Sequence, residues 1–235
     1  NMVIVGKQGL ILHGDGTNWT EIAAGATTTL HSVVWNGSQF VIVGSNTILT
    51  SPDGISWTSL STTPPALTGL IYNNNSSQFV ATRNDAALTS PDGFAWGAPM
   101  AADTTGLSDI GWDGSRFVAL QNSNAMVTSP DGTTGSAAPA ITGASGLNDI
   151  SVDGPAYVAV GNGGQVYHSD NAGASWTDAS NGSTDLYTVV WDDTRFLAMG
   201  PDGLVLTSSD GSSWTQQTTQ ILYFSWNTNG TLSRV

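Results

Sequence analysis

The sequence predicts an all-β chain folded as a six-bladed β-propeller, with four antiparallel strands per blade, and two observations lead to this fold. A short motif containing Asp and Gly, usually closed by Trp, recurs every 38 to 40 residues along the 235-residue chain. Before each copy lies an apolar segment interrupted by a polar turn. Four short strands per period, with turns between them, are typical of a propeller blade.

The recurring motif has residue types that suit a tight turn. It reads SPDGISW at 51–57, and Asp and Ser side chains can accept hydrogen bonds from the backbone of such a turn, while Gly allows a positive φ. The other copies are GDGTNW ending at Trp19, SPDGFAW at 90–96, SPDGTTG at 129–135, SDNAGASW at 169–176 and SSDGSSW at 208–214. Their first aspartates are Asp15, Asp53, Asp92, Asp131, Asp170 and Asp210.

The segments between the motifs predict the first two strands of each blade. LHSVVWNGSQFVIV, from Leu30, contains an apolar strand, the turn Asn36-Gly37 and a second strand opened by an aromatic residue. The aromatic slot is filled by Phe40, Phe79, Phe117, Tyr157 and Phe196. We expect these side chains, and the nine Trp residues that occupy two repeat slots, to pack between blades.

The two ends of the chain predict how six blades are completed. The chain starts at MVIVGKQGLIL, inside a repeat that lacks its first strand, and ends with ILYFSWNTNGTL, a first strand with nothing after it. We therefore expect one domain over residues 1–235, with the C-terminal strand completing the N-terminal blade. The predicted blades are 220–235 with 1–24, 29–60, 67–98, 106–138, 146–178 and 184–216.

Composition excludes several classes of protein. The formal net charge is −13, so nucleic acid and anionic lipid should be repelled. The chain has no Cys, which excludes disulfides and thiolate metal sites, and no apolar run approaches the length of a membrane-spanning helix, so we expect no membrane insertion. Turns rich in Ser, Thr, Asn, Asp and Gly favour an extracellular, virion or cell-surface location.

The motif resembles the Asp-box of the BNR (bacterial neuraminidase) repeat, SxDxGxxW, most closely at 169–176. The segments VGKQGLIL, VGNGGQVY and MGPDGLVL, each followed by a box, are also similar to repeats of photosystem II assembly-factor-like propellers. The resemblance covers nearly the whole chain and implies a propeller. It leaves function open, because such boxes occur in sialidases, other glycosidases, lectins and non-enzymatic scaffolds.

The residues that sialidase chemistry would require are not brought together by the repeat. The resemblance implies three Arg residues around a substrate carboxylate, but Arg116 and Arg195 share a turn at the end of the blades opposite the usual ligand face. We therefore predict no catalytic residues, no cofactor and no metal site. Asp109 and Asp149, which occupy equivalent positions on neighbouring blades, remain the alternative, either as the carboxylate pair of a glycoside hydrolase or as calcium ligands.

Residues that break the repeat are the better candidates for binding. Tyr187 opens a first strand where other blades have smaller or polar residues, and the short turns after second strands carry further polar side chains. The predicted ligand-binding residues are Tyr187, Tyr223, Lys7, Gln8, Asp202 and His31. They predict a non-enzymatic module for glycan recognition or adhesion at a cell surface. The alternative is a structural or receptor-binding propeller in a surface or phage-tail assembly, with protein neighbours.

Overall fold

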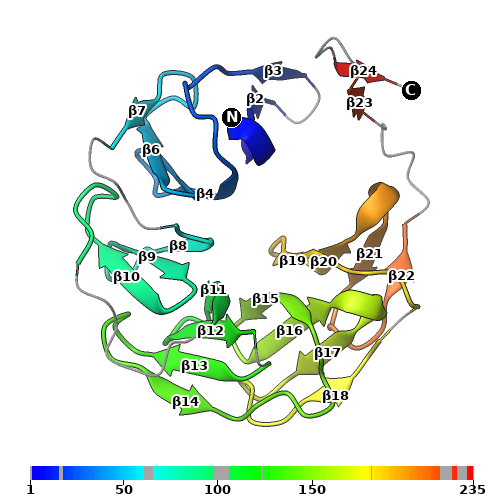
Figure 1. Cartoon of the computed structure of the whole chain (residues 1–235). Coiled ribbons are helices and arrows are strands. Elements are labelled where there is room, and N and C mark those ends of the chain that lie inside the picture. The colour runs from blue at the N-terminus through cyan, green and yellow to red at the C-terminus, as the bar shows by residue number, and fades with distance from the viewer. Residues whose placement is uncertain are drawn as a thin grey trace. The chain divides into compact units, whose positions relative to one another are not determined.

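The computed structural model describes residues 2–15, 18–60, 66–97, 106–122, 124–180, 182–217, 224–226 and 232–234. Its sheets confirm the predicted class, an all-β, six-bladed β-propeller with mostly four antiparallel strands per blade (Figure 1). The chain forms two compact units, Asn1–Ala140 and Ile141–Val235. Over the described ranges no helix is long and apolar enough to cross a membrane.

The first unit contains blades 1 to 4, in which each strand pairs antiparallel with the next strand along the chain. Blade 1 is β1 (Met2–Val5), β2 (Ile11–Gly14) and β3 (Trp19–Glu21), and blade 2 is β4 (Leu30–Trp35), β5 (Phe40–Gly44), β6 (Thr47–Ser51) and β7 (Thr58–Ser59). Blade 3 is β8 (Gly69–Asn73), β9 (Gln78–Arg83) and β10 (Ala86–Ser90), and blade 4 is β11 (Leu107–Trp112), β12 (Phe117–Gln121), β13 (Met126–Ser129) and β14 (Ser136–Ala138).

The second unit contains blades 5 and 6 and a C-terminal hairpin. Blade 5 is β15 (Leu147–Asp153), β16 (Ala156–Gly161), β17 (Val166–Ser169) and β18 (Thr177–Asp178), and blade 6 is β19 (Thr188–Trp191), β20 (Phe196–Met199), β21 (Val205–Ser208) and β22 (Thr215–Gln216). The hairpin is β23 (Phe224–Trp226) with β24 (Leu232–Arg234).

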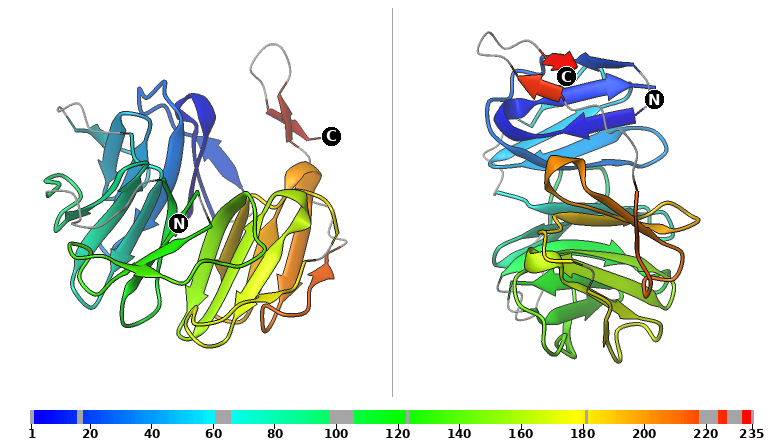
Figure 2. Two further views of the ribbon diagram at one scale, coloured as in Figure 1. Left: turned by 60° about the horizontal axis from the view of Figure 1, so that its bottom comes forward. Right: turned by 90° about the vertical axis from the view of Figure 1, so that its right-hand side faces the viewer.

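The C-terminal hairpin corrects one expectation from the sequence. The tail is not a lone first strand, because β23 pairs antiparallel with β24, the two red strands of Figure 2. The intervening segment contains Asn-Gly, a sequence that favours a tight turn between paired strands. Pairing of this tail with blade 1 would join the two units and stays a prediction.

The apolar core lies between consecutive blades of each unit. Val41, Val43 and Ile48 of blade 2 pack with Phe79 and Leu88 of blade 3. Similar clusters join blades 1 and 2, blades 3 and 4, and blades 5 and 6. In each cluster the alternating apolar residues of the second and third strands face the neighbouring sheet, as period-2 patterning requires. The predicted aromatic slot is confirmed as core, with exposures of 8% or less at Phe40, Phe79, Phe117, Tyr157 and Phe196.

The box glycines explain why blades pack closely at the end of the third strand. Gly54 has φ +76°, and a Cβ there would lie 2.9 Å from His13 Cδ2 and 3.0 Å from Val3 Cγ2, both in blade 1. Gly211 has φ +78° and meets Val158 of blade 5 in the same way. The box turns of blades 2, 3, 4 and 6 therefore rest against the preceding blade, at a distance that leaves no room for a Cβ.

Candidate functional site

One end of the blades carries a turn with the same backbone in three copies. The 3-10 turns η1 (Lys7–Gly9), η2 (Asn162–Gly164) and η3 (Pro201–Gly203) follow second strands and have middle residues with φ between +53° and +67°. In η3, the Gly200 N–H donates to Leu204 O (3.0 Å) and the Leu204 N–H to Pro201 O (2.9 Å), and η1 and η2 repeat this pair of bonds. The turns thus hold one conformation while their exposed side chains differ.

The first-strand slot that Tyr187 occupies has a structural role in other blades. In blades 2, 3 and 5 its side chain bonds to the residue 14 positions later, just past or at the end of the second strand, whereas in blade 4 the Ser108 hydroxyl donates to Leu120 O (3.3 Å). His31 Nε2 lies 3.0 Å from Ser45 Oγ, and the Asn148 Nδ2 donates to Asn162 Oδ1 (3.0 Å). Thr68 Oγ1 likewise lies 3.2 Å from Thr82 Oγ1. In the blades with His31 and Asn148, a register irregularity at this position turns the slot residue toward that partner.

Tyr187 departs from this arrangement because its partner position is a proline. The residue 14 positions after Tyr187 is Pro201, whose side chain has no hydrogen-bonding group. The Tyr187 backbone is fixed, since its N–H donates to Met199 O (2.7 Å), but its side chain is 55% exposed. Asp202, also exposed, lies in the turn that follows β20 directly. An aromatic ring and a carboxylate therefore project from the same end of blade 6.

Three further polar residues, which repeat position alone does not distinguish, extend this surface across the second unit. The Asn148 Nδ2 also donates to Leu186 O (2.8 Å), next to Tyr187. The Gly163 N–H donates to Asp185 Oδ1 (2.7 Å), which ties η2 to the segment entering blade 6. Asn162 is exposed beside them. Only the repeated spacing of 14 residues between slot and partner could have indicated this arrangement.

In the first unit the structure places three predicted residues at the equivalent end. Lys7 and Gln8 are exposed in η1, and the Leu30 N–H donates to Gly6 O (3.0 Å), which holds η1 beside the start of β4 and His31. His31 is exposed but bonded to Ser45, so it serves the fold as well. Tyr223 lies outside the described residues. Lys7, Gln8 and His31 thus belong to one unit, and Tyr187 and Asp202 to the other.

Asp149 and Asp109, the carboxylates considered for catalysis or calcium, both lie against a neighbouring blade. Asp149 Oδ1 accepts the Ile150 N–H (3.0 Å), and its Oδ2 accepts the Val189 N–H of blade 6 (2.7 Å). Asp109 lies against Gly69 of blade 3, where an added Cβ would sit 3.2 Å from its Oδ1. Asp149 therefore links first strands of adjacent blades. Among the described residues, no group of three or more His, Cys, Asp or Glu could hold a metal ion.

The opposite end of the blades carries the box, whose Asp side chain accepts several hydrogen bonds from its own turn. Asp53 Oδ1 accepts the Ser51 hydroxyl (2.9 Å), the Ile55 N–H (2.8 Å) and the Ser56 N–H (2.7 Å). The Trp57 Nε1 donates to Gly54 O (3.1 Å) and closes the turn. The backbone N–H groups of Ser56 and Ile55, followed by the Ser51 hydroxyl, lower the pKa of Asp53 to about 2.

The boxes predict a fall in stability at low pH. The pKa values of Asp92 and Asp131 are lowered and that of Asp210 falls to about 2, in each case first through a backbone N–H bond, whereas an unfolded Asp titrates near 3.8. Between about pH 4 and pH 2 the unfolded chain then binds more protons than the folded one, so stability falls as pH falls through this window. We expect the melting temperature, followed by circular dichroism, to decline there.

The box of blade 5 shows which substitution removes the titrating group and keeps the turn. It has Asn171 in the Asp place, and Asn171 Oδ1 accepts the Ser169 hydroxyl (2.9 Å) and the Ser175 N–H (2.9 Å) without a titrating group. Changing Asp53, Asp92, Asp131 and Asp210 together to Asn should keep the turns and flatten the decline. An equally steep decline in that variant would show that other groups cause it.

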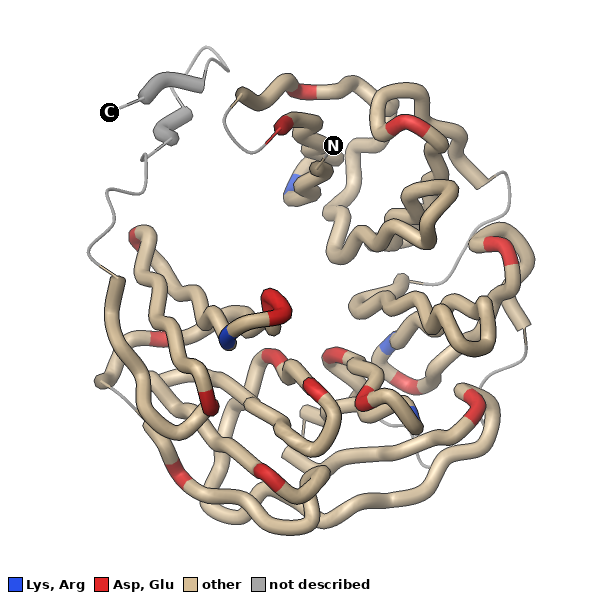
Figure 3. Tube along the Cα trace, turned by 180° about the vertical axis from the view of Figure 1, so that it is seen from behind, with Lys and Arg blue, Asp and Glu red and all other residues tan. Residues whose placement is uncertain are grey.

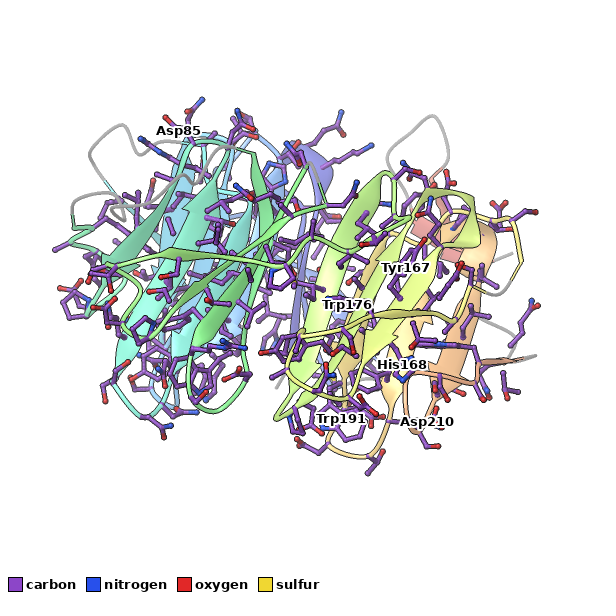
Figure 4. The ribbon with its side chains drawn as sticks, turned by 90° about the horizontal axis from the view of Figure 1, so that it is seen from below. Asp85, Tyr167, His168, Trp176, Trp191 and Asp210 are labelled. Carbon is purple, nitrogen blue, oxygen red and sulfur yellow. The ribbon has the colours of Figure 1, made fainter. Side chains whose placement is uncertain are left out.

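The structure corrects the assignment of all Trp residues to packing. Trp35, at the end of β4, is 45% exposed, although its ring centroid lies 4.5 Å from that of the buried Phe40. Trp112 and Trp191, in the same slot of blades 4 and 6, are half-buried. Figure 4 shows Trp191 and Asp210 at the same edge of the second unit, where the first turn and the box of a blade meet.

Acidic residues are spread over the blades, and basic residues are few, as Figure 3 shows. Three arginines pair with nearby aspartates. Arg83 Nε lies 2.6 Å from Asp85 Oδ1, and Arg116 and Arg195 lie 3.1 Å and 3.2 Å from Asp113 and Asp192. These short-range pairs use up much of the positive charge, so the surface presented to a ligand is acidic.

Repeated four-stranded sheets, with fixed turns that present variable side chains, define a propeller-class scaffold. No protein-family model matches the chain, and no curated protein matches it significantly. Solved structures do. "YCF48 bound to D1 peptide" is 19% identical with TM-score 0.69, covering 91% of this chain and 76% of that one. YCF48 from Cyanidioschyzon merolae is 20% identical with TM-score 0.64, covering 87% and 76%.

A WD40 propeller also has a similar fold. The WD40 β-propeller domain of Doa1 is 12% identical with TM-score 0.72, covering 93% of this chain and 79% of that one. At these identities the likenesses show the propeller fold alone. They extend to two differently named proteins, YCF48 and Doa1.

Proposed function

We propose that the chain is a non-enzymatic binding module that recognises a glycan through the end of the blades that carries Tyr187. The observation that supports this most is the release of Tyr187 from a structural role. The equivalent His31, Thr68 and Asn148 bond to the residue 14 positions later, whereas for Tyr187 that position is Pro201 and the tyrosine side chain is 55% exposed.

The chemistry of this surface suits a sugar. A tyrosine ring offers an apolar face to the C–H groups of a pyranose, and carboxylate and amide groups accept or donate hydrogen bonds to its hydroxyls. Asp202, Asn162 and Asp185 supply such groups from neighbouring segments of the same unit. We further propose an extracellular, virion or cell-surface location, in keeping with the acidic charge and the Ser, Thr, Asn and Gly in the turns.

A glycan array with the parent chain and Tyr187→Ala tests this function. We expect binding to one sugar class, weakened about tenfold or more in Tyr187→Ala, since a stacked ring contributes on the order of 1.4 kcal/mol or more. Ile55→Ala is the matched control, because Ile55 is 52% exposed but lies in a box at the opposite end of its blade. Equal binding by Tyr187→Ala, or no glycan bound by the folded parent, would refute the proposal.

The second candidate is a peptide-binding or assembly role, with a protein as the partner. It is favoured by the likeness to YCF48, which was solved with a D1 peptide. Co-purification of a protein partner, lost in Tyr187→Ala while no array glycan binds, would favour this candidate over the glycan.

A further inference from the structure

Blade 2 has a cavity at its box end, which is separate from the Tyr187 surface. The cavity has a volume of about 370 Å³ and is lined by Trp35, Phe40, Pro52 and Asp53. The Trp35 and Phe40 rings are tilted by 50° to each other, and Trp35 is 45% exposed. The cavity therefore combines an accessible indole, a proline and one carboxylate.

The carboxylate has one oxygen left for a ligand. The Ser51 hydroxyl and the Ile55 and Ser56 N–H groups all donate to Asp53 Oδ1. Its Oδ2 can still accept, and the lowered pKa keeps the group ionised at neutral pH. An anion beside the electron-rich face of an indole disfavours anionic ligands and favours a cation, which both groups attract.

In two other turns of the chain, one carboxylate oxygen accepts backbone N–H groups while the other binds a guanidinium group. In blade 4, Asp113 Oδ1 accepts the Ser115 and Arg116 N–H groups of its turn, while Oδ2 accepts the Arg116 Nε (3.1 Å). In blade 6, Asp192 and Arg195 repeat the arrangement at 3.2 Å. A turn-forming carboxylate in this fold thus readily takes a guanidinium on its second oxygen.

Blade 2 lacks the arginine that blades 4 and 6 have. Gln39 occupies the slot of Arg116 and Arg195, and its Nε2 donates to Asp92 O of the next blade (2.8 Å). The corresponding Trp is half-buried in blades 4 and 6 and exposed in blade 2. In blades 4 and 6 the guanidinium bonds to the first-turn carboxylates Asp113 and Asp192, a slot that is Asn36 in blade 2. Blade 2 therefore has no arginine of its own beside its exposed Trp35.

We propose that this cavity binds the guanidinium group of an arginine side chain from a protein partner. The planar guanidinium stacks on the Trp35 indole while its N–H groups donate to Asp53 Oδ2, a pairing that an ammonium group fits less well. The net charge of −13 attracts basic partners to the chain as a whole. This site is independent of the glycan function proposed above.

The test uses capped peptides and the indole N–H signal of Trp35 in a ¹⁵N–¹H spectrum, assigned by its loss in Trp35→Phe. The probe is acetyl-Gly-Gly-Arg-Gly-Gly-amide, and its counterpart has neutral citrulline in place of Arg. We expect the Arg peptide to shift the Trp35 signal with a dissociation constant of about 1 mM, and the citrulline peptide to leave it unchanged. No shift at about 10 mM Arg peptide, or equal shifts with both, would overturn the proposal.

Two Asn variants locate the effect. Asp53→Asn keeps the acceptor that forms the box, as Asn171 does in blade 5, and should weaken binding about tenfold. Asp210→Asn makes the same change in blade 6 and should leave binding to Trp35 unaltered. Equal weakening by both variants would indicate general charge attraction, and a shift of Trp35 by a methyl pyranoside but not by the Arg peptide would assign the cavity to sugar. Either result rejects the guanidinium site.

Discussion

Replacing Gly9 with alanine is expected to lower the free energy of unfolding by about 3 to 4 kcal/mol, the sum of a backbone and a packing penalty. Gly9 ends η1 with φ +75°, a left-handed conformation that costs an L-residue about 1 to 2 kcal/mol. A Cβ at Gly9 would also overlap the Ala26 carbonyl oxygen, which belongs to the backbone and cannot rotate away. The turn, or the segment leading into β4, must therefore shift.

Gly25 provides a matched control in the same part of the first unit. Its φ is +72°, almost that of Gly9, but an added Cβ would have no neighbour within 4 Å. Gly25→Ala should therefore cost only the backbone penalty of about 1 to 2 kcal/mol. Melting temperatures measured by circular dichroism would separate the two variants. If both fall equally, close approach at Gly9 has no energetic consequence and the turn is held less tightly than described.

The repeat in the sequence was sufficient to predict the blades because its pattern of apolar residues and turn residues has the length of single strands. Alternating apolar residues and Asp-Gly turns act within a few positions, so they can be recognised without tertiary information. The box bonds of Asp53 and the burial of Phe79 follow from such local patterns. The pairing of β23 with β24 was missed because β24 is short and lacks the aromatic opening of the second strands in the other repeats.

The candidate site was predicted less well, because it depends on contacts between segments far apart in the chain. The exposure of Tyr187 depends on Pro201, and the polar role of Asp149 depends on Val189 of the next blade. The exposure of Trp35 accompanies Gln39 reaching a neighbouring box. From repeat position alone, Trp35 and Trp112 are predicted to be equally buried, since both end a first strand.

Truncating Phe79 to alanine is expected to destabilise the protein by about 3 to 5 kcal/mol, the cost of removing a fully buried aromatic side chain from a close-packed core. Phe79 is 0% exposed at the start of β9, and its ring lies 4.7 Å from that of Tyr72. It also packs with Val41 of blade 2, so the change opens a cavity between two blades of the first unit. Phe79→Leu should lose about 1 to 2 kcal/mol, since most of the volume is kept.

Phe94 in the same blade distinguishes core packing from general apolarity. Phe94 is 40% exposed in the box, and its contribution to the turn is a backbone N–H that donates to Asp92 Oδ1 (2.8 Å). Phe94→Ala keeps that bond and should cost less than about 1 kcal/mol. Chemical denaturation of the three variants would give the ranking Phe79→Ala, Phe79→Leu, Phe94→Ala in decreasing loss. A Phe79→Ala variant as stable as Phe94→Ala would mean that blades 2 and 3 are not held together by this core.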